Sequence, residues 1–154
     1  MDPLTLAARL GLSAVFGALL GIERELRGHA AGFRTHILVA LSACLFTLVG
    51  ATGFGPPGTS GLDTTRIASQ VVVGIGFLGA GVIVRQGPSV RGLTTAANLW
   101  AAAAVGVAIG VGMYEAGAIA AAIALVVLVV LKPVERWLEK RRGPAPKHAD
   151  HPGP

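Results

Sequence analysis

Five long apolar segments, separated by short polar stretches, dominate the hydrophobic pattern of this chain. They cover residues 4–22, 36–54, 67–84, 98–113 and 116–131. A helix that crosses a bilayer needs about 20 predominantly apolar residues. Because the backbone cannot bond to water inside a bilayer, such segments must satisfy their own hydrogen bonds as helices. The pattern therefore predicts an all-α membrane protein, a polytopic bundle of about five transmembrane helices.

Residues 71–100 combine a glycine-rich apolar segment, a tight basic turn and a second apolar segment that opens with threonines and an asparagine. We expect a transmembrane helical hairpin formed by spans three and four. Glycine weakens a helix by roughly 1 kcal/mol relative to alanine, so several glycines in one span require a reason. Close helix packing supplies one, because small residues let neighbouring backbones approach in membranes. The predicted packing glycines are Gly74, Gly76, Gly79 and Gly81 here, with Gly17 and Gly21 in the first span.

The third span presents two different faces on a helical wheel. One sector holds Arg66, Gln70, Gly74, Phe77, Gly81 and Arg85, and another holds Val71, Ile75, Leu78 and Val82. We expect the glycine-rich face to be buried and the branched aliphatic face to contact lipid. Glycine spacing of this kind is compatible with packing alone as well as with a functional site.

The composition supports the same class of protein. The chain of 154 residues is 53% hydrophobic and only 14% charged, with a mean hydropathy of +0.66, which favours a membrane protein over a soluble domain. A single Cys44 lies in an apolar segment and is expected to be a packed thiol. The formal net charge of +5 does not indicate nucleic-acid binding, because the cations flank apolar spans.

Those cations predict an orientation. Of the 13 Lys and Arg residues, all but Arg9 and Arg66 lie in the loops after spans one and three or in the C-terminal region. The positive-inside rule then places the N-terminus outside and the C-terminus in the cytoplasm. One cytoplasmic rim would thus hold a functional polar cluster of Glu23, Arg24, Glu25, Arg34, Thr35, Arg85, Arg91, Thr94, Thr95 and Asn98. Its charges could neutralise one another or bind an anionic or zwitterionic ligand.

Three polar residues, Asp63, Arg66 and Gln70, are candidates on the outer side. Asp63 could cap the third helix or contact a cation. His36 stands at a span boundary without partners at ligand spacing, so we interpret it as interfacial. No metal site and no cofactor are expected.

The two halves of the chain carry motifs that are similar to one family. The stretch DTTRIASQVV with GIGFLGAGVIVRQGPSVRGLTTAANLW resembles the signature of the MgtC/SapB family of bacterial inner-membrane proteins. The upstream stretch GALLGIERELRGHAAGFRTHILVAL fits its first-loop pattern, and the resemblance covers about residues 10–114. The matching first-loop positions are Gly17, Gly21, Glu23, Arg24, Glu25, Gly32, Arg34 and Thr35.

This resemblance implies a small multispanning protein concerned with magnesium limitation, intracellular survival or membrane energetics rather than an enzyme. Better-known members carry a soluble cytoplasmic domain after the last span. Such a domain cannot fit between Lys132 and Pro154, so we expect a short member that lacks it. The expected organisation is a transmembrane domain over 1–132, then a short basic helix and disordered tail over 133–154, with Pro133 ending the fifth span.

Two functions remain open. The first is an accessory or regulatory protein that acts in the lipid bilayer by helix contacts, with itself, most simply as a dimer, or with another membrane complex such as an ATP synthase or a transporter. The alternative is a small ion or solute transporter or channel that uses the polar, glycine-rich hairpin. Arginine outnumbers carboxylate around that hairpin, which opposes a simple magnesium pore because like charges repel. Catalysis is not expected, since no nucleophile and base pair or phosphate loop is evident.

Overall fold

The protein is described here by a computed structural model, which covers residues 1–52 and 65–142. The described chain folds into five helices and one short hairpin of two strands. The elements are α1 (Pro3–Leu26), α2 (Phe33–Thr52), α3 (Thr65–Val82), β1 (Val84–Gln86), β2 (Ser89–Arg91), α4 (Leu93–Val111) and α5 (Tyr114–Arg142). The predicted all-α membrane fold is confirmed.

Four of the described helices, α1, α2, α4 and α5, are long and apolar enough to cross a membrane. The apolar part of α3, Arg66–Val82, falls just short of that length. An α-helix rises 1.5 Å per residue, so α3 is about 27 Å long against a hydrocarbon core of about 30 Å. The third apolar segment is therefore a helix at the lower limit of membrane-spanning length.

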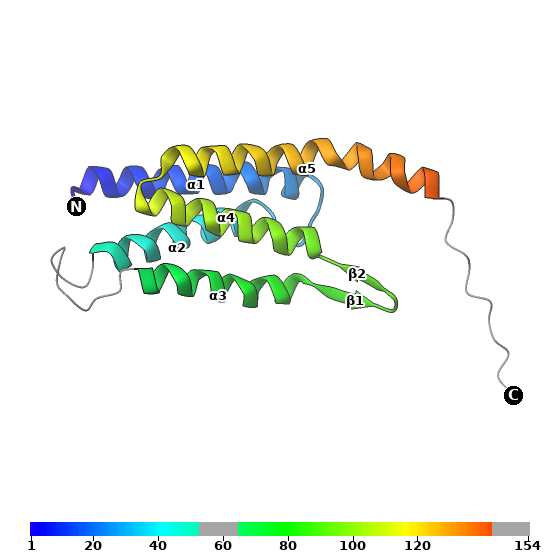
Figure 1. Ribbon diagram of the computed structural model, residues 1–154, viewed down its shortest axis with the longest axis horizontal. Coiled ribbons are helices and arrows are strands. Elements are labelled where there is room, and N and C mark those ends of the chain that lie inside the picture. The colour runs from blue at the N-terminus through cyan, green and yellow to red at the C-terminus, as the bar shows by residue number, and fades with distance from the viewer. Residues whose placement is uncertain (53–64, 143–154) are drawn as a thin grey trace, which may run out of the picture.

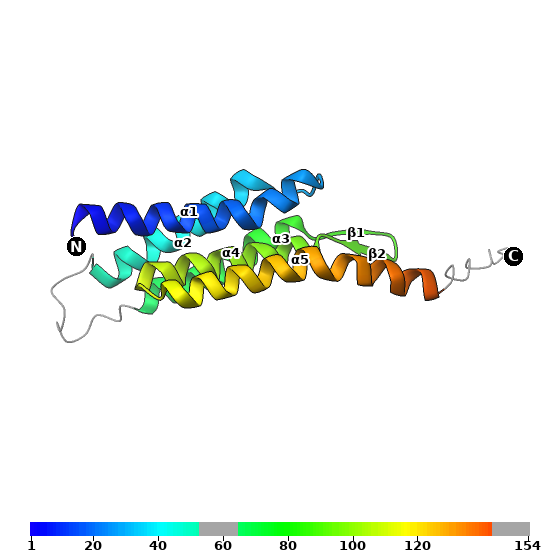
Figure 2. The same cartoon turned by 90° about the horizontal axis from the view of Figure 1, so that it is seen from above.

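The helices run side by side along the long axis of the molecule (Figures 1 and 2). Helix α4 lies centrally and contacts all four of the others, while α1 packs on α2, and α3 rests on α2 and α4. The main core joins α1, α2, α4 and α5 through Leu20, Cys44, Leu48, Ala102, Val105, Ile109 and Ala121. A second cluster joins α3 to α2 and α4 through Ile75, Ala43, Leu99 and Ala103, with Ala31.

Glycines hold α2 close to its two neighbours. A Cβ atom placed on Gly17 would lie 2.6 Å from the carbonyl oxygen of His36, and one on Gly106 would overlap the carbonyl oxygen of Ala40. Gly21 likewise faces the backbone of Phe33, at 2.8 Å from its Cα. Backbone contact at these distances is possible only without a side chain, so α1 and α4 both approach α2 through glycine.

The prediction of which face of α3 is buried within the chain is wrong. Ile75 is only 5% exposed, and of the predicted packing glycines in this helix only Gly79 is buried. A Cβ atom added to Gly79 would lie 3.5 Å from the Cβ of Ala96. A Cβ atom on Gly74, Gly76 or Gly81 would meet nothing within 4 Å in the described chain. The reason lies in α4, whose packing surface is rich in alanine. Small residues on α4 accept branched side chains from α3, so the glycine face of α3 is left uncovered.

The basic turn between α3 and α4 is an antiparallel β-hairpin that extends beyond both helices (Figure 1). Arg85 pairs with Val90 in its register, and Gly87 turns the chain with φ of +60°. Gly92 starts α4 with φ of +90°, and a Cβ there would overlap the carbonyl oxygen of Val82. Glycine is the residue that adopts such left-handed conformations without steric cost.

Helix α5 continues through Pro133 to Arg142, whereas its apolar candidate span ends at Leu131, just before this proline. The short basic helix predicted after Pro133 is therefore a direct continuation of the fifth span. Proline removes one backbone donor, which kinks or weakens a helix but does not stop it when its neighbours hold the chain. The guanidinium carbon of Arg141 lies 3.9 Å from the centre of the Trp137 ring in this extension. The tail predicted over the last residues, 143–154, lies outside the described residues.

Candidate functional site

A buried histidine and asparagine join three helices near one end of the bundle. His36 on α2 is 0% exposed, and its Nε2 lies 2.9 Å from Nδ2 of Asn98 on α4. The other ring nitrogen, Nδ1, lies 2.8 Å from the carbonyl oxygen of Gly32. These two contacts fit a ring that donates from Nδ1 and accepts the Asn98 amide proton at Nε2. The same amide nitrogen lies 3.4 Å from the carbonyl oxygen of Leu20 on α1.

The interpretation of His36 as interfacial is therefore wrong, and this residue is the one that sequence reasoning missed at the site. A lone histidine carries no partner signal in sequence, because Asn98 lies 62 positions away. The sequence contains one signal for a buried residue here, which is the pair of glycines, Gly17 and Gly21, in α1. Gly21 leaves room for the histidine, since a Cβ there would lie 3.0 Å from the Cβ of His36.

Helix α1 runs to Leu26, so Glu23, Arg24 and Glu25 belong to its last turns rather than to a loop. Arg24 points inward, is 4% exposed, and donates from Nη2 to the hydroxyl of Thr95 on α4. Glu23 pairs with Arg27 one turn later, at 2.8 Å between Oε1 and Nε. A buried guanidinium at a helix end thus connects α1 to α4 in the same layer as the His36 and Asn98 pair.

Glu25, in the same turn, bonds to the start of α2. Its Oε2 accepts a hydrogen bond of 3.0 Å from the backbone N–H of Phe33, the first residue of α2. A carboxylate in this position satisfies a free amide at the positive end of a helix. Gly32 lies directly beside it, and a Cβ atom there would displace the Glu25 carboxylate from this position.

The remaining members of the predicted cluster do not join this buried layer. Arg34, Thr35, Arg85, Arg91 and Thr94 are exposed, whereas Thr95 and Asn98 are buried. The guanidinium of Arg85 bonds to the carbonyl oxygen of Gly87 at 3.1 Å within its own hairpin. The expectation that Arg85 and Asn98 face one interior is therefore wrong, because the hairpin carries Arg85 beyond the helices.

The candidates on the opposite side are dispersed. Arg66 and Gln70 are exposed on α3, and Asp63 lies outside the described residues. Arg9 of α1 was not predicted to act, yet it donates to the carbonyl oxygen of Gly110 at 2.8 Å and to the hydroxyl of Tyr114 at 2.9 Å. A cation at this point satisfies the free carbonyls at the negative end of α4. Arg9 thereby connects α1 to the turn between α4 and α5.

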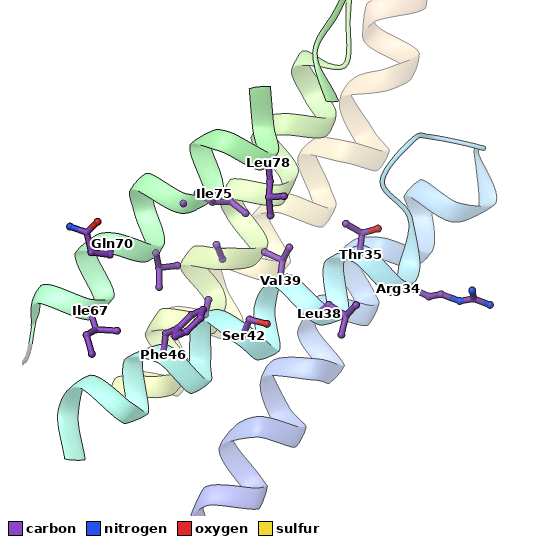
Figure 3. Close-up of a pocket in the computed structure, with 14 residues that line it drawn as sticks. Arg34, Thr35, Leu38, Val39, Ser42, Phe46, Ile67, Gln70, Ile75 and Leu78 are labelled. Atoms are coloured by element: carbon purple, nitrogen blue, oxygen red, sulfur yellow. The ribbon is translucent and has the colours of Figure 1, made fainter. Parts of the chain in front are cut away.

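The described bundle has several cavities, and two of them border the polar residues discussed above. An apolar groove of about 680 Å³ lies between α2 and α3, with Arg34 and Thr35 toward one end and Gln70 on the α3 side (Figure 3). A smaller cavity of about 380 Å³ lies beside the buried arginine. It is lined by Glu23, Arg24, His29, Val90, Gly92, Leu93, Thr94, Thr95, Val127, Leu128 and Leu131. In residues 1–52 and 65–142, no group of three or more His, Cys, Asp or Glu side chains could hold a metal ion.

The fold, with its apolar helices and its buried polar layer, is that of a multi-pass membrane-embedded protein. The model of the MgtC family matches residues 10–137, and the chain belongs to this family. The resemblance inferred from the two sequence motifs is thus confirmed.

Several curated relatives are similar to the chain. A protein of Escherichia coli K12 named "Putative magnesium transporter YhiD" is 46% identical over 125 residues, which cover 79% of this chain and 58% of that protein. Protein MgtC of Brucella abortus strain 2308 is 43% identical over 140 residues, 89% of this chain and 57% of that protein. The chain spans less than two thirds of the length of these relatives. A comparison with solved structures gave no significant match.

Proposed function

We propose that this chain is an accessory or regulatory protein of the bacterial inner membrane, linked to magnesium handling, which acts by helix contacts and not by transport or catalysis. The observation that carries the proposal is the uncovered face of α3. Gly74 and Gly81 have open space where a side chain would lie, and Phe77 between them is 82% exposed. In a membrane, a face of this kind allows another helix to approach closely.

The groove beside this face supports the same conclusion. Gly74 and Ile75 line the cavity between α3 and α2, so the glycine face continues into a recess (Figure 3). The recess is bounded mainly by apolar side chains such as Leu38 and Phe46. An apolar recess next to small residues suits a helix of a second copy of the chain, or of another membrane complex such as an ATP synthase or a transporter.

The interior of the bundle argues against a conducting path. Arg24 is bonded to Thr95, and His36 to Asn98, so these buried polar groups are turned toward one another. Beyond them the helices meet through small and apolar side chains, such as Ala102, Val105 and Ile109, which are at most 1% exposed. A path for a hydrated ion requires polar groups and water along its length, whereas these described side chains pack without such groups.

A small transporter is the second candidate, and one observation favours it. The name of the YhiD relative describes a magnesium transporter, and that relative is 46% identical over 125 residues. A transport role would require the helices to separate around the buried polar layer, since alternating access moves one part of a bundle against another.

The orientation proposed from the cations agrees with the geometry. The loop after α1, the β-hairpin and the C-terminal part of α5 all lie toward the same end of the bundle (Figure 1). Arg27 and the two hairpin arginines, Arg85 and Arg91, are exposed in these segments. We place this end in the cytoplasm and the N-terminus outside, because positively charged loops remain on the cytoplasmic side.

Gly74→Leu tests the proposed contact surface. A strain that depends on this protein is expected to lose growth in low-magnesium medium when it carries the variant, with unchanged protein level and melting temperature. The side chain has open space in the chain itself, yet it would block an approaching helix. Gly11→Leu is the matched control, because Gly11 of α1 also has nothing within 4 Å. Normal growth of the Gly74 variant would contradict the proposal.

A further inference from the structure

The cavity beside Arg24 combines two buried charged side chains with an apolar wall. The Glu23 side chain is 9% exposed, and Arg24 is 4% exposed. Both line the same space of about 380 Å³, together with the threonines at the start of α4. The cavity is lined by residues from the end of α1, the loop after it, β2, the start of α4 and α5.

Each charged side chain leaves one polar atom unmatched. Oε2 of Glu23 and Nε of Arg24 are buried and have no hydrogen-bond partner within the part of the chain that the structure describes. The other carboxylate oxygen of Glu23 is held by Arg27, and Nη2 of Arg24 by Thr95. Burying such groups without a partner is unfavourable, and more so when they are charged. Both residues line the cavity, so a ligand there would lie beside these side chains.

The unmatched pair specifies the chemistry of a partner. Oε2 of Glu23 needs a donor, whereas Nε of Arg24 needs an acceptor. A bare cation fits poorly, because Arg24 and Arg27 both lie within the next turn of the chain after Glu23. A simple anion would leave the Glu23 oxygen facing like charge. A ligand with an ammonium and a phosphate group satisfies both atoms, and the Thr94 hydroxyl can donate to the same phosphate.

Apart from His29 of the loop after α1, the rest of the lining is apolar and comes from α5, β2 and the start of α4. Val127, Leu128 and Leu131 form one side of the cavity, with Leu93 nearby. Val127 and Leu131 are also exposed on the outer surface of α5, so this side of the cavity is continuous with the surface that lipid covers. An acyl chain can lie along these residues while the headgroup stays at the polar end.

We propose that this cavity binds the headgroup of an aminophospholipid such as phosphatidylethanolamine, with its ammonium on Glu23, its phosphate on Arg24 and an acyl chain along α5. The site is separate from the glycine face of α3 and does not depend on whether the protein regulates or transports. It would hold one lipid at the end of the bundle where α1, α4 and α5 meet.

Lipid retention tests this site without any variant. Purified full-length protein is placed in nanodiscs that contain equal amounts of phosphatidylethanolamine, phosphatidylcholine and phosphatidylglycerol, and the retained lipids are measured by native mass spectrometry. We expect about tenfold preference for phosphatidylethanolamine, because a charge-assisted hydrogen bond contributes about 1.5–3 kcal/mol and 1.4 kcal/mol is tenfold in affinity. Phosphatidylcholine has no N–H to donate. Equal retention of the three lipids would overturn the proposal and leave water as the partner of both atoms.

Substitutions test whether the Glu23 carboxylate causes the preference for phosphatidylethanolamine. Glu23→Gln should reduce the preference over phosphatidylcholine to about one, whereas Glu115→Gln, an exposed carboxylate at the start of α5, should preserve it. A preference for phosphatidylglycerol in the unmodified protein would overturn the role of Glu23. Soluble phosphoethanolamine separates the headgroup from the lipid. If it displaces the retained lipid at millimolar concentration, the acyl chain along α5 is not part of the site.

Discussion

Gly106→Ala is expected to destabilise the bundle more than any other glycine-to-alanine substitution inside the described helices. Its new Cβ atom would overlap the carbonyl oxygen of Ala40, which belongs to the backbone of α2 and cannot rotate away. Helices α2 and α4 must therefore move apart. This movement also weakens the packing of Ala43 on α2 and of Val105 on α4, which belong to the two core clusters. Overpacking of this kind costs about 1–3 kcal/mol, so the melting temperature in detergent should fall by several degrees.

Gly76→Ala is the matched control for that substitution. It adds the same methyl group to a helix glycine, but Gly76 has nothing within 4 Å of the new atom. Alanine favours a helix by about 1 kcal/mol over glycine, so the variant should be as stable as the original or slightly more stable. Equal melting temperatures for the Gly106 and Gly76 variants would contradict the close packing of α2 on α4.

Asn98→Ala is the second substitution with a large expected effect. It removes the donor that faces Nε2 of His36 and the carbonyl oxygen of Leu20, so two buried acceptors lose their partner. An unmatched buried group costs about 1–3 kcal/mol, and the variant should melt at a lower temperature and accumulate less. Arg85→Ala is the control, because this arginine is exposed and donates its hydrogen bond to Gly87 in its own hairpin.

A double-mutant cycle separates the pair from the two individual residues. Side-chain hydrogen bonds inside membrane proteins show coupling of about 0.6 kcal/mol on average and about 1.7 kcal/mol at most. Combining Asn98→Ala with His36→Ala should therefore cost less than the sum of the single variants by an amount in this range. Strict additivity of the two effects would show that the histidine and the asparagine do not interact.

Sequence predicted the helices well because hydrophobic length alone decides whether a segment spans a bilayer. It did not predict the packing of α3, because the side that a helix buries depends on the surface it meets. The alanines of α4 provide the small residues at that contact. Ile75 of α3 therefore packs there, and Gly74 lies on the uncovered face. The β-hairpin was missed for a similar reason, since its strands contain only three residues each.

The candidate site was predicted in part. Arg24, Thr95 and Asn98 carry the signal of polar residues next to apolar spans, and all three are buried. His36 was misinterpreted because its burial depends on the space left by Gly17 and Gly21 on a different helix. Arg85 was grouped with the site because loop residues share a side of the membrane, which says nothing about contact. Charge patterns thus indicate at which end of the bundle a residue lies, whereas the contacts that it makes depend on how the helices pack.

Magnesium flux through the purified protein tests the accessory role most directly. The full-length chain is reconstituted alone into sealed liposomes that contain a magnesium-sensitive dye, and uptake is compared with that of protein-free vesicles over a range of external magnesium. We expect the two rates to be equal, because Arg24 bonds to Thr95 and Asn98 to His36, and beyond these pairs the helices pack through small and apolar side chains such as Ala102 and Ile109. Saturable uptake that requires the protein, and that Asn98→Ala abolishes at equal protein content, would contradict the accessory role and establish transport.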